Sequence, residues 1–260
     1  MDVELTRVSQ AADALAEYTN TTLSDCESAI QTALKREDNT RRVLFVDHPM
    51  YPKAVQESGV GPLPLEVCGV PHPLDVRLAA ILGDSSESEH WTFAYQVGKK
   101  FSSEGFPIVS ILDGGIGSSV LEATAMNYSR AVAICPDGID AALETFPLVT
   151  EQLLKSGGML VALPVAHDHS CLMGLTVSFA ADVVGVHGFF SNHNGLSAAA
   201  PVVGQPHRRL YVAAAEAEEH EWVRQTADQQ QNVRLFEHPA TMQIGGEISE
   251  PSEEETPALT

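Results

Sequence analysis

Short apolar segments alternate with amphipathic segments along the middle of the chain. Three apolar segments, 79–83, 107–112 and 131–135, each run directly into a loop of small residues. Strands that are apolar on both faces are typical of parallel sheets covered by helices. The same pattern predicts three further strands, at 159–163, 182–186 and 209–213. Because these strands alternate with helical segments, the sequence predicts an α/β fold with a Rossmann-like, doubly wound, mostly parallel sheet.

Amphipathic and alanine-rich segments between these strands predict the covering helices. The expected helices are, in chain order, 89–103, 118–127, 147–155, 173–180, 196–203 and 214–230. Gly105 is suited to end the first of them, because glycine tolerates the left-handed conformation that follows many helices. The PDGID segment at 136–140 is interpreted as a turn in which Asp137 and Asp140 are turn and cap residues. The strand at 209–213 is expected to be the last.

Two helices are predicted before the first strand. Residues 3–35 are rich in Ala, Leu, Glu and Thr, and their helical pattern breaks at 19–22. Ser24, with Glu27 three positions on, is suited to cap the second helix. We therefore expect a small helical N-terminal extension over residues 1–40.

The Rossmann-like domain is expected to span residues 41–240. Its first part predicts short strands at 42–46 and 65–69. Between them, residues 51–59 predict a short helix with Pro52 at its first position, where the missing N–H of proline costs no helical hydrogen bond.

Negative charge dominates the composition. The chain has 35 Asp and Glu against 15 Lys and Arg, and a formal net charge of −20. Residues 247–260 hold five acids and no base, and removing them still leaves −15 on residues 1–246. An acidic surface repels nucleic-acid phosphate, although a local basic patch can outweigh the net charge. The Ser-, Glu- and Pro-rich tail at 245–260 is predicted to be disordered.

Neither a membrane span nor a secretion signal is expected. No apolar run approaches the roughly 18 residues that span a bilayer, and the opening residues, MDVELTRVSQ, lack the pattern of a signal peptide. The cysteines at 26, 68, 135 and 171 are widely spaced without a CxxC pair, which favours buried free thiols. These observations predict a cytoplasmic protein.

Glycine- and serine-rich loops follow two of the predicted strands and are candidates for ligand binding. Their backbone N–H groups and hydroxyls, placed ahead of a helix, can bind phosphate. The residues concerned are Gly83, Asp84, Ser85, Ser86, Gly114, Gly115, Gly117 and Ser118. Asp113 would oppose a phosphate and suits a ribose hydroxyl or a base instead. The alternative is that the glycines permit tight turns and the serines cap helices.

Short motifs stand in a particular order between residues 51 and 213. They are YP at 51–52, GPLPL at 61–65 with Gly69, ILGDS at 81–85, VSILDGGIG at 109–117, AVAICPDGID at 131–140 with FP at 146–147, CLMGLT at 171–176, and GLSA at 195–198. In order and spacing they resemble the DNA-processing protein A (DprA/Smf) family. That family carries YP…PPxLxxG, a strand ending in GSR, then VSGLARGID, AVLGCGLD with YP, IIAGLS and SGxLxTA.

The resemblance implies a Rossmann-like fold, single-stranded DNA binding, a recombinase partner and a homodimer. It also adds Gly138 and Gly195, in the motifs at 131–140 and 195–198, to the candidate ligand-binding residues.

Several arginines of the family pattern are missing here. Ser85 stands at the arginine position of GSR, Gly114 at the arginine position of RGID and Gly117 at its aspartate position. Residues 168–170 read DHS where the family has RNR. Residues 110–200 include two basic residues, Arg130 and Lys155, and eight Asp and Glu residues. Losing several phosphate contacts weakens DNA binding by orders of magnitude at physiological salt.

The remaining candidates for site chemistry have weaker patterns. His167, His169, His187 and His193 lack a typical ligand spacing, so we interpret them as polar loop residues and expect no metal. Ser170-Cys171 lacks a nucleophile signature, and we expect no catalytic activity and no cofactor. Phe189-Phe190 could stack bases, with burial in packing as the favoured interpretation. Adjacent Lys or Arg residues occur at 35–36, 41–42, 99–100 and 208–209.

Three functions remain open at this point. The first is a divergent DprA-like DNA-processing protein that binds single-stranded DNA or assists a recombinase, without catalysis. The second is a binder of a nucleotide-derived small molecule that has lost DNA binding, and the third is a structural or interaction role. The lost arginines count against the first, and the retained glycine and serine loops favour the second over the third.

Overall fold

A computed structural model describes residues 3–69, 77–190, 193–205 and 207–244. The strands in these ranges are β1 (Arg41–Leu44), β2 (Leu65–Gly69), β3 (Ala79–Leu82), β4 (Ile108–Ile111), β5 (Ala131–Ile134), β6 (Met159–Ala162), β7 (Asp182–Gly185), β8 (Arg209–Ala213) and β9 (Val233–Phe236). They form one nine-stranded sheet in the order β1-β2-β6-β5-β4-β3-β7-β8-β9. The β1–β2 and β2–β6 pairings are antiparallel and the others are parallel. The predicted doubly wound, mostly parallel sheet is confirmed.

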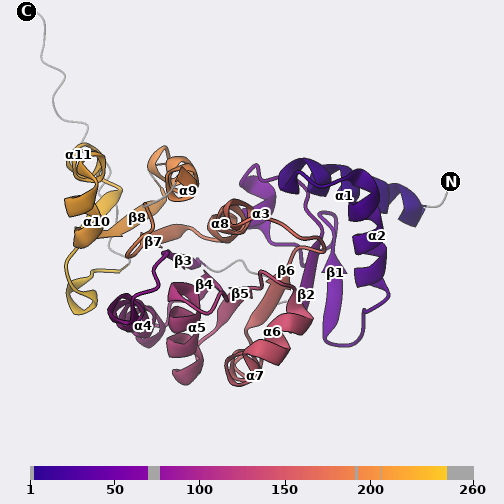
Figure 1. Ribbon diagram of the computed structural model, residues 1–260, viewed down its shortest axis with the longest axis horizontal. Coiled ribbons are helices and arrows are strands. Elements are labelled where there is room, and N and C mark those ends of the chain that lie inside the picture. Colours follow the sequence, from indigo (N-terminus) through magenta and orange to yellow (C-terminus); the bar gives the residue numbers. More distant parts are fainter. Residues whose placement is uncertain (1–2, 70–76, 191–192, 206, 245–260) are drawn as a thin grey trace, which may run out of the picture.

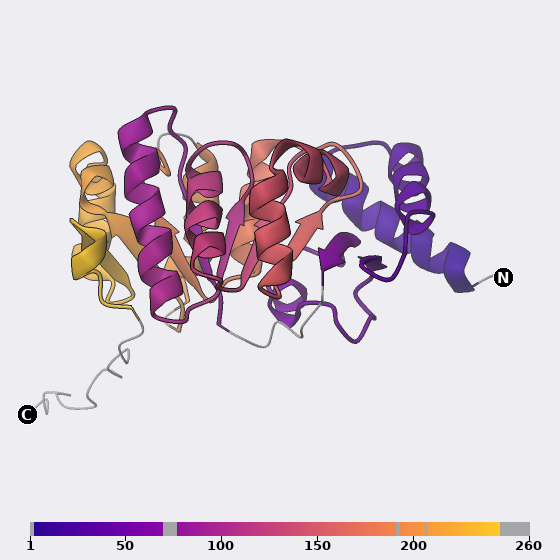
Figure 2. The same ribbon diagram turned by 90° about the horizontal axis from the view of Figure 1, so that it is seen from below.

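Helices cover both faces of this sheet (Figures 1 and 2). One face carries α4 (Ser88–Ser103), α5 (Ile116–Met126), α6 (Ile139–Thr145) and α7 (Pro147–Lys155). The other carries α1 (Val3–Thr19), α2 (Leu23–Leu34), α3 (Lys53–Glu57), α8 (His169–Ser178), α9 (His193–Val203), α10 (Ala214–Glu219) and α11 (Glu221–Gln229). None of the helices within the described ranges is long and apolar enough to cross a membrane.

The strand order reverses at β3. From β3 the chain moves outward through β4 and β5 to β6, returns to place β7 against the other edge of β3, and continues to β8 and β9. Every residue of β3 to β8 is buried, which explains why these strands are mostly apolar on both faces. Ser110, Asp182 and Arg209 are their buried polar residues. Open sheets of this kind bind ligands at the carboxyl ends of their strands, next to such a reversal.

Three predicted elements in the second half of the chain are wrong in detail. The PDGID segment is the start of α6 rather than only a turn: Gly138, with φ +88°, precedes the helix, and Asp140 lies in its first turn. The helix predicted over 214–230 is two helices separated at His220. The strand at 209–213 is followed by β9, which pairs with it in parallel.

Two predicted helix starts near the N-terminus are also wrong. Thr22 caps α2 in place of Ser24, because the Thr22 hydroxyl accepts the N–H of Asp25 at 3.2 Å. Pro52 precedes α3 as its capping residue and is not its first helical residue. The tail predicted to be disordered, 245–260, lies outside the described residues.

Candidate functional site

The loops that follow β3 and β7 meet where the strand order reverses. The N–H of Asp84 donates to the carbonyl oxygen of His187 at 3.0 Å. Gly188 has φ +76°, and a Cβ there would overlap the backbone of Asp84, so only glycine permits this approach. The β3 and β7 loops are therefore in direct backbone contact at the place where many doubly wound sheets bind a ligand.

A buried carboxylate occupies the backbone donors after β7. Glu216 is 1% exposed, and its two oxygens accept the N–H groups of Gly188 at 2.7 Å and Phe190 at 3.0 Å. Successive N–H groups of this kind form anion sites in many proteins. Here the anion is the carboxylate of Glu216, which belongs to the chain itself. Glu216 was not predicted from the sequence because the Ala/Glu segment around it has the pattern of an ordinary solvated helix.

The serine of the β3 loop also has partners within the fold. Ser85 Oγ lies 2.7 Å from His90 Nδ1 and accepts the N–H of Glu87 at 3.1 Å. The His90 ring stacks on His187 with centroids 3.9 Å apart. Burial, and then the neighbouring His90, lower the pKa of His187. The structure therefore places Gly83 and Asp84 against the β7 loop, and Ser85 against His90 of α4.

The glycines of the β4 loop have similar internal roles. The N–H of Gly114 donates to Ser118 Oγ at 2.6 Å, and the N–H of Gly115 donates to Asp113 Oδ1 at 2.8 Å. A Cβ at Gly117 would overlap a carbonyl oxygen of β4, so this glycine allows α5 to pack close to the sheet. Two of the N–H groups predicted to bind phosphate are thus already used.

A pocket of about 280 Å³ lies at the carboxyl ends of β4 and β5, between α6 and α8, and we call it the β4–β5 pocket. Its lining residues are Leu112, Asp113, Pro136, Asp137, Gly138, Ala141, Ala142, Thr145, Phe146, His169 and Leu172. Among the predicted site residues, Gly138 lines it, and a Cβ on Gly114 would lie 3.8 Å from Phe146. The pocket combines an apolar wall with two carboxylates and one imidazole.

Asp113 is the polar residue of this pocket with the clearest perturbation. Burial among protein atoms raises the pKa of its carboxyl group, although the N–H of Gly115 and the nearby His169 act in the opposite direction. Asp113 is nevertheless exposed, so its carboxylate remains accessible to a ligand in the pocket. Asp113 is therefore suited to accept hydrogen bonds from a ligand.

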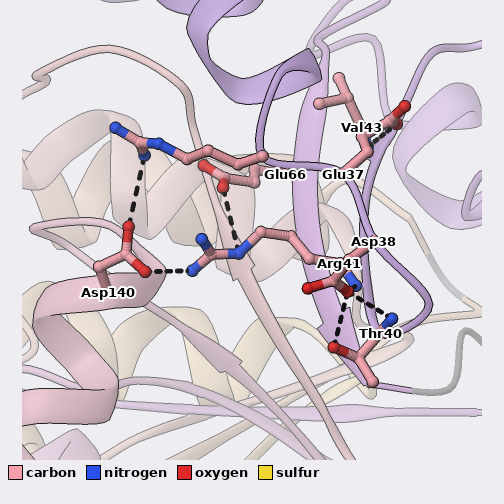
Figure 3. Close-up of polar contacts among 8 residues, drawn as sticks. Glu37, Asp38, Thr40, Arg41, Val43, Glu66 and Asp140 are labelled. Carbon is pink, nitrogen blue, oxygen red and sulfur yellow. Dashed lines mark hydrogen bonds and ion pairs between the residues drawn. The ribbon is translucent and has the colours of Figure 1, made fainter.

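Basic side chains that might hold DNA are engaged elsewhere. Figure 3 shows Arg41 between two acids: its Nη2 is 2.6 Å from Asp140 Oδ1, and its Nε is 3.5 Å from Glu66 Oε1. Arg36 contacts the other oxygen of Asp140 at 3.5 Å. Arg208 and its neighbour at 209 are buried. Among the adjacent Lys and Arg residues offered as a possible DNA footprint, Arg36 and Arg41 are therefore held in ion pairs with Asp140. Lys35, Arg42 and Lys99 are exposed.

The two adjacent phenylalanines belong to the core. Phe189 and Phe190 are 1% and 4% exposed, and their rings meet edge to face at 4.6 Å. Phe190 also contacts the ring of Trp222 at 4.8 Å. A Cβ on Gly195 would overlap the backbone of Phe189, so this predicted site residue serves close packing. The favoured interpretation, burial, is confirmed, and base stacking by this pair is wrong.

The histidine and cysteine candidates form no metal or thiolate site within the described ranges. No group of three or more His, Cys, Asp or Glu side chains there could hold a metal ion. Cys171 donates from Sγ to the carbonyl oxygen of Tyr18 at 3.2 Å, and burial raises the pKa of its thiol to about 11. At neutral pH this thiol stays protonated, which makes it a poor nucleophile. The free thiols predicted from the sequence are all buried.

These features define a Rossmann-like α/β protein with a polar pocket at the carboxyl edge of its sheet. No protein-family model and no curated protein matches the sequence. Among solved structures, the chain is similar to DNA processing protein A (DprA) from Streptococcus pneumoniae. The alignment covers 84% of this chain and 79% of that protein, with a TM-score of 0.59 and 14% identity. The alignment with DprA from Helicobacter pylori covers 76% of this chain and 93% of that protein, with a TM-score of 0.54 and 14% identity.

A molybdenum cofactor carrier protein from Chlamydomonas reinhardtii matches more weakly. The alignment covers 64% of this chain and 92% of the carrier protein, with a TM-score of 0.46 and 9% identity. The chain therefore has a DprA-like fold, as the motif order predicted. At 14% identity the likeness extends to the fold alone.

Proposed function

We propose that this chain binds a nucleotide-derived small molecule in the β4–β5 pocket and holds its base or ribose there, without catalysing a reaction. The observation that carries the proposal is the placement of Asp113 and Asp137 beside an apolar wall that includes Phe146. Carboxylates accept hydrogen bonds, so the ligand must present donors, as the exocyclic amines of bases and the hydroxyls of ribose do. The Phe146 ring offers an apolar face for a base.

The charge of the pocket argues against a phosphate in it. Two aspartates line it, and no Lys or Arg does so among the residues that the structure describes. Its volume of about 280 Å³ is close to the lower end of the roughly 300–1,000 Å³ of drug-sized ligand sites. A base or a nucleoside fits this size better than a chain of nucleotides, whose backbone would have to remain outside.

Single-stranded DNA is the second candidate, and the DprA-like fold favours it. The Helicobacter pylori structure is described as a single-stranded DNA binding mode of DprA. An assembly of several copies could also bring dispersed exposed arginines together and present DNA to a recombinase. The ion pairs of Arg41 and the net charge of −20 count against this candidate, because DNA affinity depends on free cations.

One pair of titrations separates the two candidates. Calorimetry with adenosine, guanosine, cytidine and uridine tests the pocket, and fluorescence anisotropy of a labelled oligodeoxynucleotide at low and moderate salt tests DNA. We expect one nucleoside to bind. Asp113→Asn should lower the affinity for that nucleoside at least tenfold, because a hydrogen bond to a charged group contributes about 1.5–3 kcal/mol. The asparagine oxygen can still accept the N–H of Gly115, so the loop should remain intact.

Glu122→Gln is the matched control, because Glu122 is exposed on α5 and lies outside the pocket. Equal nucleoside binding by Asp113→Asn and the parent, or no nucleoside binding at millimolar concentration, would refute the pocket proposal. Tight oligonucleotide binding that weakens steeply with salt would establish DNA as the ligand instead.

A further inference from the structure

A second pocket lies at the opposite edge of the sheet, before the amino ends of β3 and β7. It has a volume of about 210 Å³, and we call it the Arg208 pocket. Its lining includes Ala54 and Glu57 of α3, Leu78, Ala181 and Arg208. No residue of the β4–β5 pocket contributes to it.

The guanidinium of Arg208 is buried without a carboxylate partner. The residue is 8% exposed, and its Nη2 donates to the carbonyl oxygens of Val177 at 2.9 Å and Ala180 at 2.7 Å, at the end of α8. Its Nε is buried and has no hydrogen-bond partner in the described structure. Burial lowers the pKa of Arg208, and the charge of Asp182 only partly opposes this.

Asp182 does not neutralise this cation, because it already has a partner. Both of its oxygens bind Arg77, at 2.6 Å and 2.8 Å. The carbonyls at the end of α8 give Arg208 partial compensation through the negative end of the helix dipole. They engage only Nη2 and leave Nε unsatisfied, and a buried donor without an acceptor costs about 1–3 kcal/mol.

Backbone hydrogen bonds position Arg208 on the described side of its loop. The Arg208 N–H donates to the carbonyl oxygen of Gln205 at 3.0 Å. The amide of Asn232, itself buried, donates to the carbonyl oxygens of Gln205 at 3.3 Å and Arg208 at 3.1 Å. A cation fixed before its ligand arrives loses little side-chain entropy on binding.

We propose that the Arg208 pocket binds a small oxyanion, namely phosphate or a phosphate monoester, through the Arg208 guanidinium. Both hydrogens of Nη2 are used by the two carbonyl oxygens, so the oxyanion would accept single hydrogen bonds from the remaining N–H groups of the guanidinium. The positive charge of the guanidinium strengthens hydrogen bonds of this kind. At about 210 Å³ the pocket holds a phosphate with a small organic group rather than a drug-sized molecule. Glu57 lines the same pocket, and because it is exposed its repulsion is weakened by solvent.

The test uses the full chain and inorganic phosphate, with binding followed by calorimetry at low ionic strength and acetate as the comparison anion. Three variants are made. Arg208→Met removes the cation, Ala54→Phe fills the pocket and leaves Arg208 in place, and Glu57→Gln removes the repulsion. We expect phosphate to bind the parent, the first two variants to weaken binding at least tenfold, and Glu57→Gln to strengthen it.

Arg208→Met also removes the cap of α8, so Ala54→Phe decides the question if Arg208→Met does not fold. No phosphate binding to the parent at 20 mM, unchanged binding in Ala54→Phe, or a preference for acetate would overturn the proposal. Asp113→Asn, at the other edge of the sheet, should leave phosphate affinity unchanged, so the two sites can fail independently.

Discussion

Replacing Glu216 with glutamine tests whether the carboxylate holds the β7 loop in place. Glutamine has nearly the same shape but only one acceptor oxygen, and its amide nitrogen is a donor. Whichever way the amide is turned, it faces either the N–H of Gly188 or the N–H of Phe190 with another N–H group. One buried backbone donor is therefore left without an acceptor.

The size of the effect follows from these two hydrogen bonds. An unsatisfied buried N–H costs about 1–3 kcal/mol, and the remaining bond loses the roughly twofold strength that a charged acceptor gives it. Glutamine also removes a buried charge, which returns part of this cost. We expect Glu216→Gln to lower the free energy of unfolding by about 2–4 kcal/mol. For a protein of this size that is on the order of 10 °C in the melting midpoint.

The assay is urea unfolding followed by circular dichroism, together with amide hydrogen exchange at Gly188 and Phe190. Exchange at both positions should accelerate in the variant, because the loop opens more often. Glu218→Gln is the matched control: Glu218 lies on the same helix, is exposed, and should change stability by less than about 0.5 kcal/mol. If Glu216→Gln were as stable as the parent, the carboxylate would not be holding the loop.

Two further substitutions test the electrostatics. Arg41→Ala leaves the buried Glu66 without its nearest cation and should destabilise the fold by about 2–4 kcal/mol at pH 7. Burial already raises the pKa of Glu66, so near pH 5 more of this carboxyl group is protonated and the loss of stability caused by Arg41→Ala should be smaller. Urea unfolding at pH 7 and pH 5 measures this loss, and an equal loss at both pH values would contradict the reasoning. Folding lowers the pKa of His187 below the unfolded value of about 6.5, so the folded protein favours the neutral imidazole. The stability that depends on this neutral form is fully present above about pH 6.5 and is lost as the pH falls toward the folded pKa. His187→Phe should flatten this slope between pH 7.5 and 5, and an unchanged slope would assign the pH dependence to other groups.

The parts of the fold that could be predicted from sequence are those buried on both sides. The strand predicted at 131–135 differs from β5 by one residue, because an apolar run this short between turn residues suits a buried strand and is too short for a helix. In contrast, β9 was missed because Arg234 and Leu235 are not buried, so its pattern is not apolar throughout. α6 was missed because seven residues give too short a helical pattern beside a strong turn signal.

The candidate site was harder to predict, for a reason that concerns hydrogen bonds. The sequence places glycines and serines after strands, but it does not say which acceptors their N–H groups meet. The N–H groups of Gly114 and Gly115 meet Ser118 and Asp113 inside their own loop. That Asp113 suits a ribose hydroxyl or a base rather than a phosphate stays a prediction, and the structure places Asp113 in the β4–β5 pocket.

The reversal of strand order at β3 also determines when the sheet can be completed during synthesis. β3 pairs with β4 only 29 residues further along, from Ala79 to Ile108, but with β7 from Ala79 to Asp182. In a nascent chain that ends before β7, β3 is therefore an exposed apolar edge of the partial sheet, although it is an interior strand of the complete sheet. Such edges recruit other chains. Fragments that end between β6 and β7 should aggregate, whereas fragments that include β7 no longer leave this edge open.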